Sequence, residues 1–156
     1  MITFRLANLD DAEILMQWRN DFSAYKNFLQ SRPVKREIHL NWLQTIIANK
    51  RRHLFIILED QKLIGQVRFD QDGEDSAEIS ITIDKRFRGR GLGAESIKLS
   101  SMMFFENQKH IRRIFAIVKI GNNFSINAFL KGGFNKIKEK DGLLFFEIFK
   151  PEGVFN

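Results

Sequence analysis

The most informative segment of the chain is Ile83-Asp84-Lys85-Arg86-Phe87-Arg88-Gly89-Arg90-Gly91-Leu92-Gly93. Its three glycines stand at alternate positions, between a strand-like pattern and a helix-like pattern. Amide N–H groups in the first turn of a helix have no partner within the helix and lie at the positive end of its dipole. Glycine lets an anion approach that backbone, because it has no Cβ. The segment therefore predicts a phosphate-binding loop, with Arg88 and Arg90 as added charged contacts.

Two other phosphate-binding loops and one structural turn are the alternatives for this segment. A Walker loop ends in Gly-Lys-Ser or Gly-Lys-Thr, whereas this loop continues as Gly93-Ala94-Glu95. A dinucleotide-binding loop opens a parallel βαβ unit and is followed about 20 residues later by an acid. Here an antiparallel pattern precedes the loop, and no suitable acid follows it. A simple turn rich in Gly and Arg stays open, but it does not explain alternate glycines at a helix start.

The clearest strand pattern of the chain leads into this loop. Between Ser76 and Asp84, apolar residues alternate with polar ones, namely Ala77, Ile79, Ile81 and Ile83 with Glu78, Ser80, Thr82 and Asp84. A period of two predicts a strand with one apolar and one polar face. Upstream, residues 54–58 and 62–70 are expected strands, and Asp72-Gly73 is a hairpin signal. Downstream, a helix is expected over 92–108 and a buried strand over 113–118.

The remaining elements complete an α/β pattern. Strands are expected over residues 2–6, 134–137 and 143–149, and helices over 36–49, over 124–131 and after an N-cap at Asp10. Antiparallel strands followed by a helical crossover predict a mixed sheet with helices on both faces. Because the 156 residues contain no linker and no repeat, we expect a single domain over residues 1–156.

Composition restricts the class of function. The chain has no Cys, which excludes disulfides and thiolate sites, and its three His are too scattered to predict a metal site. No apolar run reaches the roughly 20 residues of a membrane helix, and the N-terminus does not resemble a signal peptide, so we expect a cytoplasmic protein. The net charge of +6 indicates an anionic ligand such as CoA or a nucleotide, or simply solubility. Nucleic acid is not an expected partner, because the basic residues form no single tract.

Two segments resemble the acyl-CoA-binding motifs of GNAT N-acetyltransferases. Residues 83–93 resemble Arg/Gln-x-x-Gly-x-Gly/Ala, with Arg88, Gly91 and Gly93 at the fixed positions. Residues 122–134 resemble the family's Asn-x-x-Ser/Ala…Tyr-x-x-x-Gly-Phe segment. The resemblance implies a seven-stranded mixed sheet whose strands over 78–84 and 113–118 splay apart to form an acyl-CoA cleft. It also implies acetyl-CoA as co-substrate, with its pyrophosphate on the loop and its pantetheine arm along the first of these strands.

The resemblance also implies which residues act. CoA contacts are expected from Ile81, Ile83, Arg88, Gly89, Arg90, Gly91, Leu92, Gly93, Ala94, Asn122, Ser125 and Phe129. An acceptor amine would attack the thioester directly, so catalysis consists mainly of positioning and proton removal. Glu78, on the polar face of the strand that enters the cleft, is the candidate base, and its alternative is a solvated strand residue.

One position departs from the family pattern. Phe129 stands where the family usually has a Tyr that protonates the leaving thiolate, and Phe has no proton to give. Tyr25, the single tyrosine, lies in a segment that does not match. A water or a hydroxyl would then protonate the thiolate, with Ser80 and Ser125 as the candidate hydroxyls, and release of CoA as an anion is the alternative.

A narrower resemblance concerns the acceptor. Trp18-Arg19-Asn20, residues 37–42 and residues 65–70 are similar to GNAT enzymes that acetylate nucleotide-linked aminosugars, as in pseudaminic or legionaminic acid biosynthesis. It implies that Arg19 and His39 contact the nucleotide-sugar, and Arg68 and Asp70 are further candidates for acceptor contacts. The alternative for Arg19 is an ion pair with a carboxylate such as Asp21, and that for His39 is a histidine satisfied on the helix surface. For Arg68 and Asp70 the alternative is a role in cross-strand ion pairing.

The sequence thus leads to an N-acetyltransferase acting on a primary amine, with a nucleotide-linked aminosugar as the expected acceptor. Acetylation of a protein N-terminus is the second hypothesis, and a CoA-binding module without turnover, suggested by Phe129, is the third. A homodimer is left open.

Overall fold

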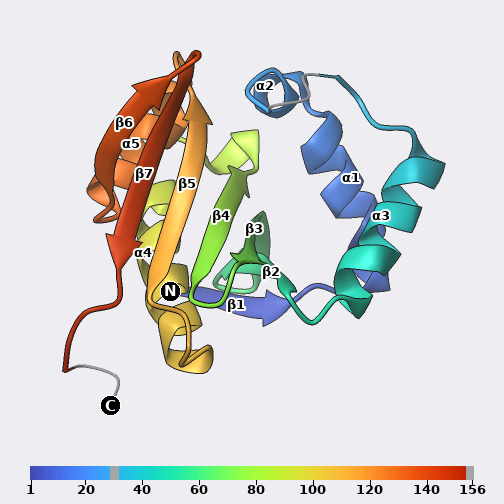
Figure 1. Ribbon diagram of the computed structural model, residues 1–156. Helices are drawn as coiled ribbons and strands as arrows, with labels where there is room; N and C mark the ends of the chain where they lie inside the picture. Colours follow the sequence, from blue (N-terminus) through green and yellow to red (C-terminus); the bar gives the residue numbers. More distant parts are fainter. Residues whose placement is uncertain (29–31, 154–156) are drawn as a thin grey trace.

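The computed structural model describes residues 1–28 and 32–153. In this part of the chain one seven-stranded sheet has the order β1-β2-β3-β4-β5-β7-β6, and Figure 1 shows its arrangement. The strands are β1 (Ile2–Leu6), β2 (Arg52–Glu59), β3 (Lys62–Asp72), β4 (Ser76–Ile83), β5 (Arg113–Lys119), β6 (Asn135–Lys140) and β7 (Leu143–Phe149). The helices are α1 (Ala12–Asn20), α2 (Phe22–Tyr25), α3 (Arg36–Ala48), α4 (Leu92–Asn107) and α5 (Asn123–Lys131), with short 3-10 helices η1 (Leu9–Asp11) and η2 (Lys85–Phe87).

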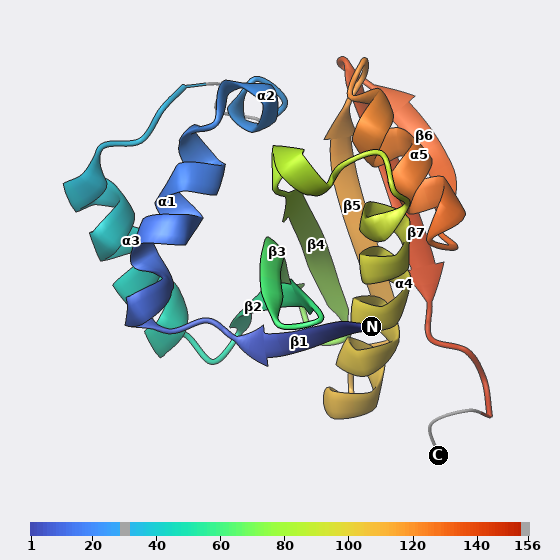
Figure 2. The same ribbon diagram turned by 180° about the vertical axis from the view of Figure 1, so that it is seen from behind.

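The topology confirms the mixed sheet expected from the sequence. Strands β1 to β4 form an antiparallel meander, α4 crosses over to β5, which runs parallel to β4, and β7 lies between β5 and β6. Helices α1 and α3 lie on one side of the sheet (Figure 1), and α4 and α5 lie on the other (Figure 2). No helix in the described part of the chain is both long and apolar enough to cross a membrane.

The alternation seen in the sequence places each face of β4 in a different environment. Ile79 and Ile83 belong to the larger core, together with Phe69 of β3 and with Phe104 and Phe105 of α4. A smaller core lies under α1 and α3 and includes Leu15, Trp18, Leu43, Ile46, Leu54 and Ile56. Because Leu54 and Ile56 come from β2, this core packs α1 and α3 against β2. The neighbouring strands β3 and β4, both described in full, contribute no buried residue to it.

The start of the first helix differs from the sequence-based prediction. Asn8, rather than Asp10, is the capping residue, and its side chain accepts a hydrogen bond of 2.9 Å from the Asp10 amide. The carboxylate of Asp11 completes a capping box by accepting from the Asn8 amide at 2.9 Å. Asp11 also forms a two-pronged ion pair with Arg5, which holds the pKa of that carboxyl below its usual value. The first turn is therefore a 3-10 helix, and α1 begins only at Ala12.

The feature that positions the site is the short pairing between β4 and β5. The two strands are in register only from Ser76 to Glu78 and from Arg113 to Phe115. Beyond these residues β4 continues to pair with β3 as far as Ile83, and β5 continues with β7 as far as Lys119. The sheet is therefore split between its central parallel strands, which confirms the splay that the family resemblance implied.

Candidate active site

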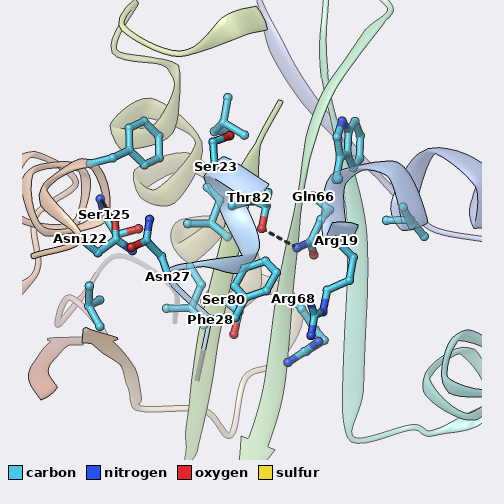
Figure 3. Close-up of a pocket in the computed structure, with 18 of the residues that line it drawn as sticks. Arg19, Ser23, Asn27, Phe28, Gln66, Arg68, Ser80, Thr82, Asn122 and Ser125 are labelled. Carbon is cyan, nitrogen blue, oxygen red and sulfur yellow. Dashed lines mark hydrogen bonds between the residues drawn. The ribbon is translucent and has the colours of Figure 1, made fainter. Parts of the chain in front are cut away.

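A cavity of about 570 Å³ opens at this split. Its walls come from α1, α2, α3, β3, β4, β5 and α5, and from residues between α2 and α3. Figure 3 shows polar side chains from these different elements pointing into one space. Of the residues predicted from the sequence, the cavity is lined by Arg19, His39, Arg68, Glu78, Ser80, Ile81, Ile83, Arg88, Asn122, Ser125 and Phe129.

One wall of the cavity is a row of polar side chains on β3 and β4. The register pairs Gln66 with Thr82, Arg68 with Ser80 and Asp70 with Glu78, and alternation places all six side chains on the face toward α1 and α3. Five of the six line the cavity, and Asp70 does not. The polar half of the β4 pattern thus forms a wall of the site.

The backbone of β4 is exposed to the split at alternate residues. The Asp84 amide donates to the Ile64 carbonyl at 2.8 Å, so the hydrogen-bonding groups of Asp84 face β3. Because these groups alternate along a strand, those of Ile81 and Ile83 face away from β3, toward the side where β5 has separated. Arg88 Nε donates to the Ile83 carbonyl at 2.8 Å. The backbone of Ile81 is therefore the part of β4 best placed to pair with an extended ligand.

The glycine loop forms the start of α4, and its glycines are required for two different structural reasons. Gly89 and Gly91 have φ values of +81° and +76°, and a Cβ on either would meet nothing within 4 Å. Gly91 is the N-cap, and no side chain among the described residues caps this helix. A Cβ on Gly93 would instead lie 2.9 Å from the Phe124 ring. Two glycines therefore shape an open loop at the start of α4, while the third allows α5 to pack closely against α4.

The two arginines of the loop make contacts within the protein. Arg88 donates to Ser23 Oγ at 2.9 Å and lies 3.9 Å from the Asp21 carboxylate. Arg90 forms an ion pair with Glu59 at 3.1 Å. Arg88 lines the cavity, whereas the described residues 89–94 do not. Predicted phosphate contacts from residues 89–94 would therefore be made on the loop, outside the cavity itself.

Asp84 is an important residue that sequence reasoning treated only as part of the polar strand face. Its carboxylate accepts from Trp18 Nε1 at 3.0 Å, from the Arg86 amide at 2.9 Å and from Arg86 Nη2 at 2.8 Å. The Arg86 side chain is the largest cause that holds the pKa of Asp84 well below its usual range. Asp84 thus fixes α1 to the loop that follows β4. The signal in the sequence was an Asp at a strand end, where a carboxylate can bond the amide two residues on.

Glu78 lies at the closed end of the split, in the last residue pair that joins β4 to β5. Burial raises the pKa of its carboxyl, repulsion from Asp70 raises it further, and Arg68 opposes the shift. A carboxylate with a raised pKa is better matched to accept a proton near neutral pH. Asp70 itself is held by Arg68 at 2.9 Å within β3 and by Arg52 at 3.0 Å across to β2.

The α5 side of the cavity contains Phe129 and two polar residues. Phe129 is buried against Phe134 and Phe146, with ring centroids 5.2 and 5.9 Å away. Asn122 caps α5 by accepting from the Ser125 amide at 3.2 Å, and both residues appear together in Figure 3. The Ser125 side chain is therefore placed on the cavity wall near the apolar Phe129 ring. Ser80 lies on the polar row.

His39 and Arg19 lie on the side of the cavity formed by α1 and α3, near Trp42. His39 is only 4% exposed and stacks on the Trp42 ring at 5.3 Å, so it is a buried residue of the cavity wall and does not lie on the helix surface. Burial lowers its pKa, as does the nearby charge of Arg19, while a hydrogen bond with the Ala12 backbone opposes the shift. Its Nε2 has no partner within the described chain. Arg19 lies over the Phe28 ring at 4.7 Å and donates to the Arg32 carbonyl at 3.0 Å. Among the described residues, no cluster of His, Asp or Glu could hold a metal ion.

A sheet split beside an open helix N-terminus defines a class of α/β domain that can hold an extended ligand with an anionic group. Comparison with known proteins places the chain within a family of this class. Residues 2–135 match the family described as Acetyltransferase (GNAT) domain. The chain therefore belongs to the GNAT acetyltransferase family.

Two relatives are similar to this chain in sequence, and one solved structure is similar to it in fold. The uncharacterized protein MJ1062 of Methanocaldococcus jannaschii is 31% identical over 143 residues, which cover 88% of this chain and 29% of that protein. Acetyltransferase PseH of Campylobacter jejuni is 26% identical over 108 residues, covering 68% of this chain and 66% of PseH. The chain thus spans less than two thirds of each relative. The spermidine N-acetyltransferase of Vibrio cholerae, solved with CoA and spermine, has a TM-score of 0.83 at 17% identity and 95% coverage of both chains, a likeness of fold alone.

Proposed function

We propose that this chain is an acetyl-CoA-dependent N-acetyltransferase, and that its acceptor is the primary amine of a nucleotide-linked aminosugar. The observation that carries the proposal is the split between β4 and β5, which joins the open N-terminus of α4 to the polar row of β3 and β4. A thioester ligand and an amine can therefore meet in one cavity.

The CoA half of the site is formed by backbone. The first-turn amides of α4, after Gly91, would hold the pyrophosphate, because they are uncapped and lie at the positive end of a 16-residue helix. The Ile81 backbone would pair with the amide groups of the pantetheine arm. Arg88 Nε already donates a hydrogen bond to the Ile83 carbonyl. The pantetheine arm can therefore pair only with the β4 backbone that precedes Ile83.

The chemical step needs one base and a way for the thiol to leave. Acetyl-CoA supplies the thioester, and the acceptor nitrogen forms the new C–N bond as the C–S bond breaks. In this proposal Glu78 takes the proton of the amine, directly or through water, a role supported by its raised pKa and its position on the cavity wall. Phe129 offers no proton to the departing sulfur, so Ser125, on the same side of the cavity, or solvent supplies it.

The acceptor class is supported by the charge and shape of the lining. Arg19, Arg68 and Arg88 line the cavity among the described residues, against the single carboxylate of Glu78. A site for a polycation such as a polyamine is expected to have the opposite balance. Arginine binds phosphate in a forked geometry, and the stacked rings of His39 and Trp42 provide a flat apolar surface. These features suit an acceptor that carries phosphate and a ring as well as an amine.

The test is acetyl transfer by the wild-type chain to a UDP-linked 4-amino sugar, with spermine and an N-terminal peptide as competing acceptors. We expect release of free CoA and formation of the N-acetyl product with the sugar nucleotide. Release of CoA with the peptide or spermine, and none above background with the sugar nucleotide, would refute the proposed acceptor.

Phe129 favours a second candidate function, a CoA-binding module without turnover. The apolar side chain removes the proton donor that the family pattern expects at this place. Calorimetric binding of CoA together with no acetylation of any of the three acceptors would favour this candidate over the enzyme.

A further inference from the structure

Gln66 contributes a buried, unpaired oxygen to the cavity wall. Its Oε1 has no hydrogen-bond partner within the described chain, although the residue lines the cavity. A buried polar atom without a partner destabilises the folded state, so such atoms are uncommon in proteins. Where one faces a cavity, a ligand can supply the missing partner.

The surroundings of Gln66 explain why the protein leaves this oxygen unpaired. The other end of the amide is engaged, since Nε2 donates to Thr82 Oγ1 at 3.2 Å, the contact drawn in Figure 3. Thr82 is itself buried on β4. On the other side, the residue paired with Gln66 on β2 is Ile56, which is fully buried and has no side-chain donor. The contact to Thr82 therefore fixes the amide, and the sheet provides nothing for its oxygen.

Four buried side-chain atoms in the described chain lack a partner, and they fall into two groups. Ser96 Oγ and Ser101 Oγ lie on α4, away from the residues that line the cavity. His39 Nε2 and Gln66 Oε1 both belong to residues that line it. His39 comes from α3 and Gln66 from β3, so the two unpaired atoms belong to different walls of the acceptor side.

We infer that Gln66 determines acceptor specificity, because its Oε1 accepts a hydrogen bond from a hydroxyl or N–H group of the acceptor. Thr82 is the positioning residue that holds the amide in this orientation. The inference deepens the proposed function and rests on it for the nature of the donor, which in an aminosugar is a ring hydroxyl or the amine. An acceptor without a donor at this place would leave the oxygen buried and unpaired, and sites of this kind reject such analogues strongly.

The experiment compares Gln66→Met, which keeps the length of the side chain and removes the oxygen, with Gln66→Glu, which keeps an accepting oxygen. Gln71→Met is the matched control, because Gln71 lies on the same strand, outside the cavity, and contacts His53. With the UDP-linked 4-amino sugar as acceptor, we expect Gln66→Met to raise the KM for the acceptor about tenfold, the loss of one hydrogen bond. The KM for acetyl-CoA should stay within about twofold. Gln66→Glu should recover most of the acceptor affinity, and Thr82→Val should reproduce part of the defect.

Thermal unfolding separates this role from a structural one. Gln66→Met removes the unpaired oxygen, which favours folding, and also the Nε2 contact with Thr82, which opposes it, so its Tm should stay within about 3 °C of that of the wild type. A lowered Tm with an unchanged acceptor KM would overturn the inference, as would a defect confined to acetyl-CoA. If the wild type acetylates spermine or the peptide instead of the sugar nucleotide, the proposed acceptor fails, and the same variants measured on that amine still decide the role of Gln66.

Discussion

The two faces of the β3–β4 hairpin are made by alternate residues of the same strands, and they differ in burial and in polarity. One face is buried in the larger core, and its side chains have no polar atoms that need a hydrogen-bond partner. It is formed by Val67, Phe69, Ile79 and Ile83. On the other face the polar row of β3 and β4 includes an unpaired oxygen, and a carboxyl group whose pKa is raised. The comparison teaches that one face stabilises the fold, whereas the other carries polar groups that are not fully paired within the protein. In the proposed function these groups interact with a ligand.

The largest effect is expected from an apolar substitution on the stable face. Phe69 is fully buried and stacks on Phe104 with ring centroids 4.3 Å apart. Phe69→Ala should lower the free energy of unfolding by about 3–5 kcal/mol, because it leaves a cavity in the larger core. Urea titration measures this loss, and Ser80→Ala, on the opposite face, should change the free energy by less than about 1 kcal/mol. Equal losses for both variants would erase the distinction between the faces.

The polar face should respond in activity instead. Glu78→Gln should lower kcat by about 100-fold or more, because the amide cannot take the proton of the amine. Its stability at neutral pH should be unchanged or higher, since a carboxyl whose folded pKa is raised opposes folding once it ionises. Steady-state kinetics and urea titration check the two parts. In wild type, kcat/KM should fall as the pH drops through the raised pKa of Glu78, and this limb should be absent from the residual activity of the variant.

Asp84 fixes α1 to the loop that follows β4, and its loss should affect stability in a pH-dependent way. Asp84→Asn should cost about 1–3 kcal/mol at neutral pH, because it weakens charge-assisted bonds from Arg86 and Trp18. The folded pKa is lowered, so the carboxylate stabilises the protein fully at pH above the ordinary Asp value and less as the pH falls below about 3.9. The difference between wild type and variant should therefore shrink in acid. A difference that stays constant between neutral pH and pH 3 would contradict this assignment.

The smallest effect is expected from replacing a glycine of positive φ, and the test compares the glycine loop with the turn between β3 and β4. Gly91→Ala and Gly73→Ala both place a Cβ on a residue with positive φ, +76° and +73°, in open space. Each should therefore lower stability by about 1–2 kcal/mol. Only Gly91→Ala should also raise the KM for acetyl-CoA, because Gly91 caps the helix that is proposed to hold the pyrophosphate. Equal KM values in the two variants would remove the anion site from the loop.

Local patterns predicted most of the fold. The period-two alternation of residues 76–84 gave a strand that the structure confirms over Ser76–Ile83, and β7 was predicted at its observed bounds. The last edge strand was expected to end at Ile137, but β6 continues to Lys140. All six of its residues are exposed, so no buried face leaves a periodic signal in its lysine-rich sequence. The position of the helix cap was predicted wrongly because Asn8 and Asp10 are both acceptable capping residues.

The site was predicted less completely, since its contacts join residues far apart in the sequence. The pairing of Gln66 with Thr82 spans 16 residues, and that of Trp18 with Asp84 spans 66. No periodicity reports such pairs. The glycine spacing identified the loop, yet it did not show that Gly93 accommodates Phe124 or that Arg90 pairs with Glu59. Motifs located the cavity, and the tertiary fold alone determined which of its polar atoms remain unpaired.

The two tryptophans of the chain, Trp18 and Trp42, both line the cavity. Trp18 bonds the Asp84 carboxylate at the base of the glycine loop, which is proposed to hold CoA, whereas Trp42 stacks with His39 on the side proposed to bind the acceptor. The tryptophan fluorescence of the protein therefore originates entirely from the cavity wall, with one fluorophore on α1 and the other on α3. A titration with either substrate can be followed by emission alone, and Trp18→Phe and Trp42→Phe assign the signal to one fluorophore or the other.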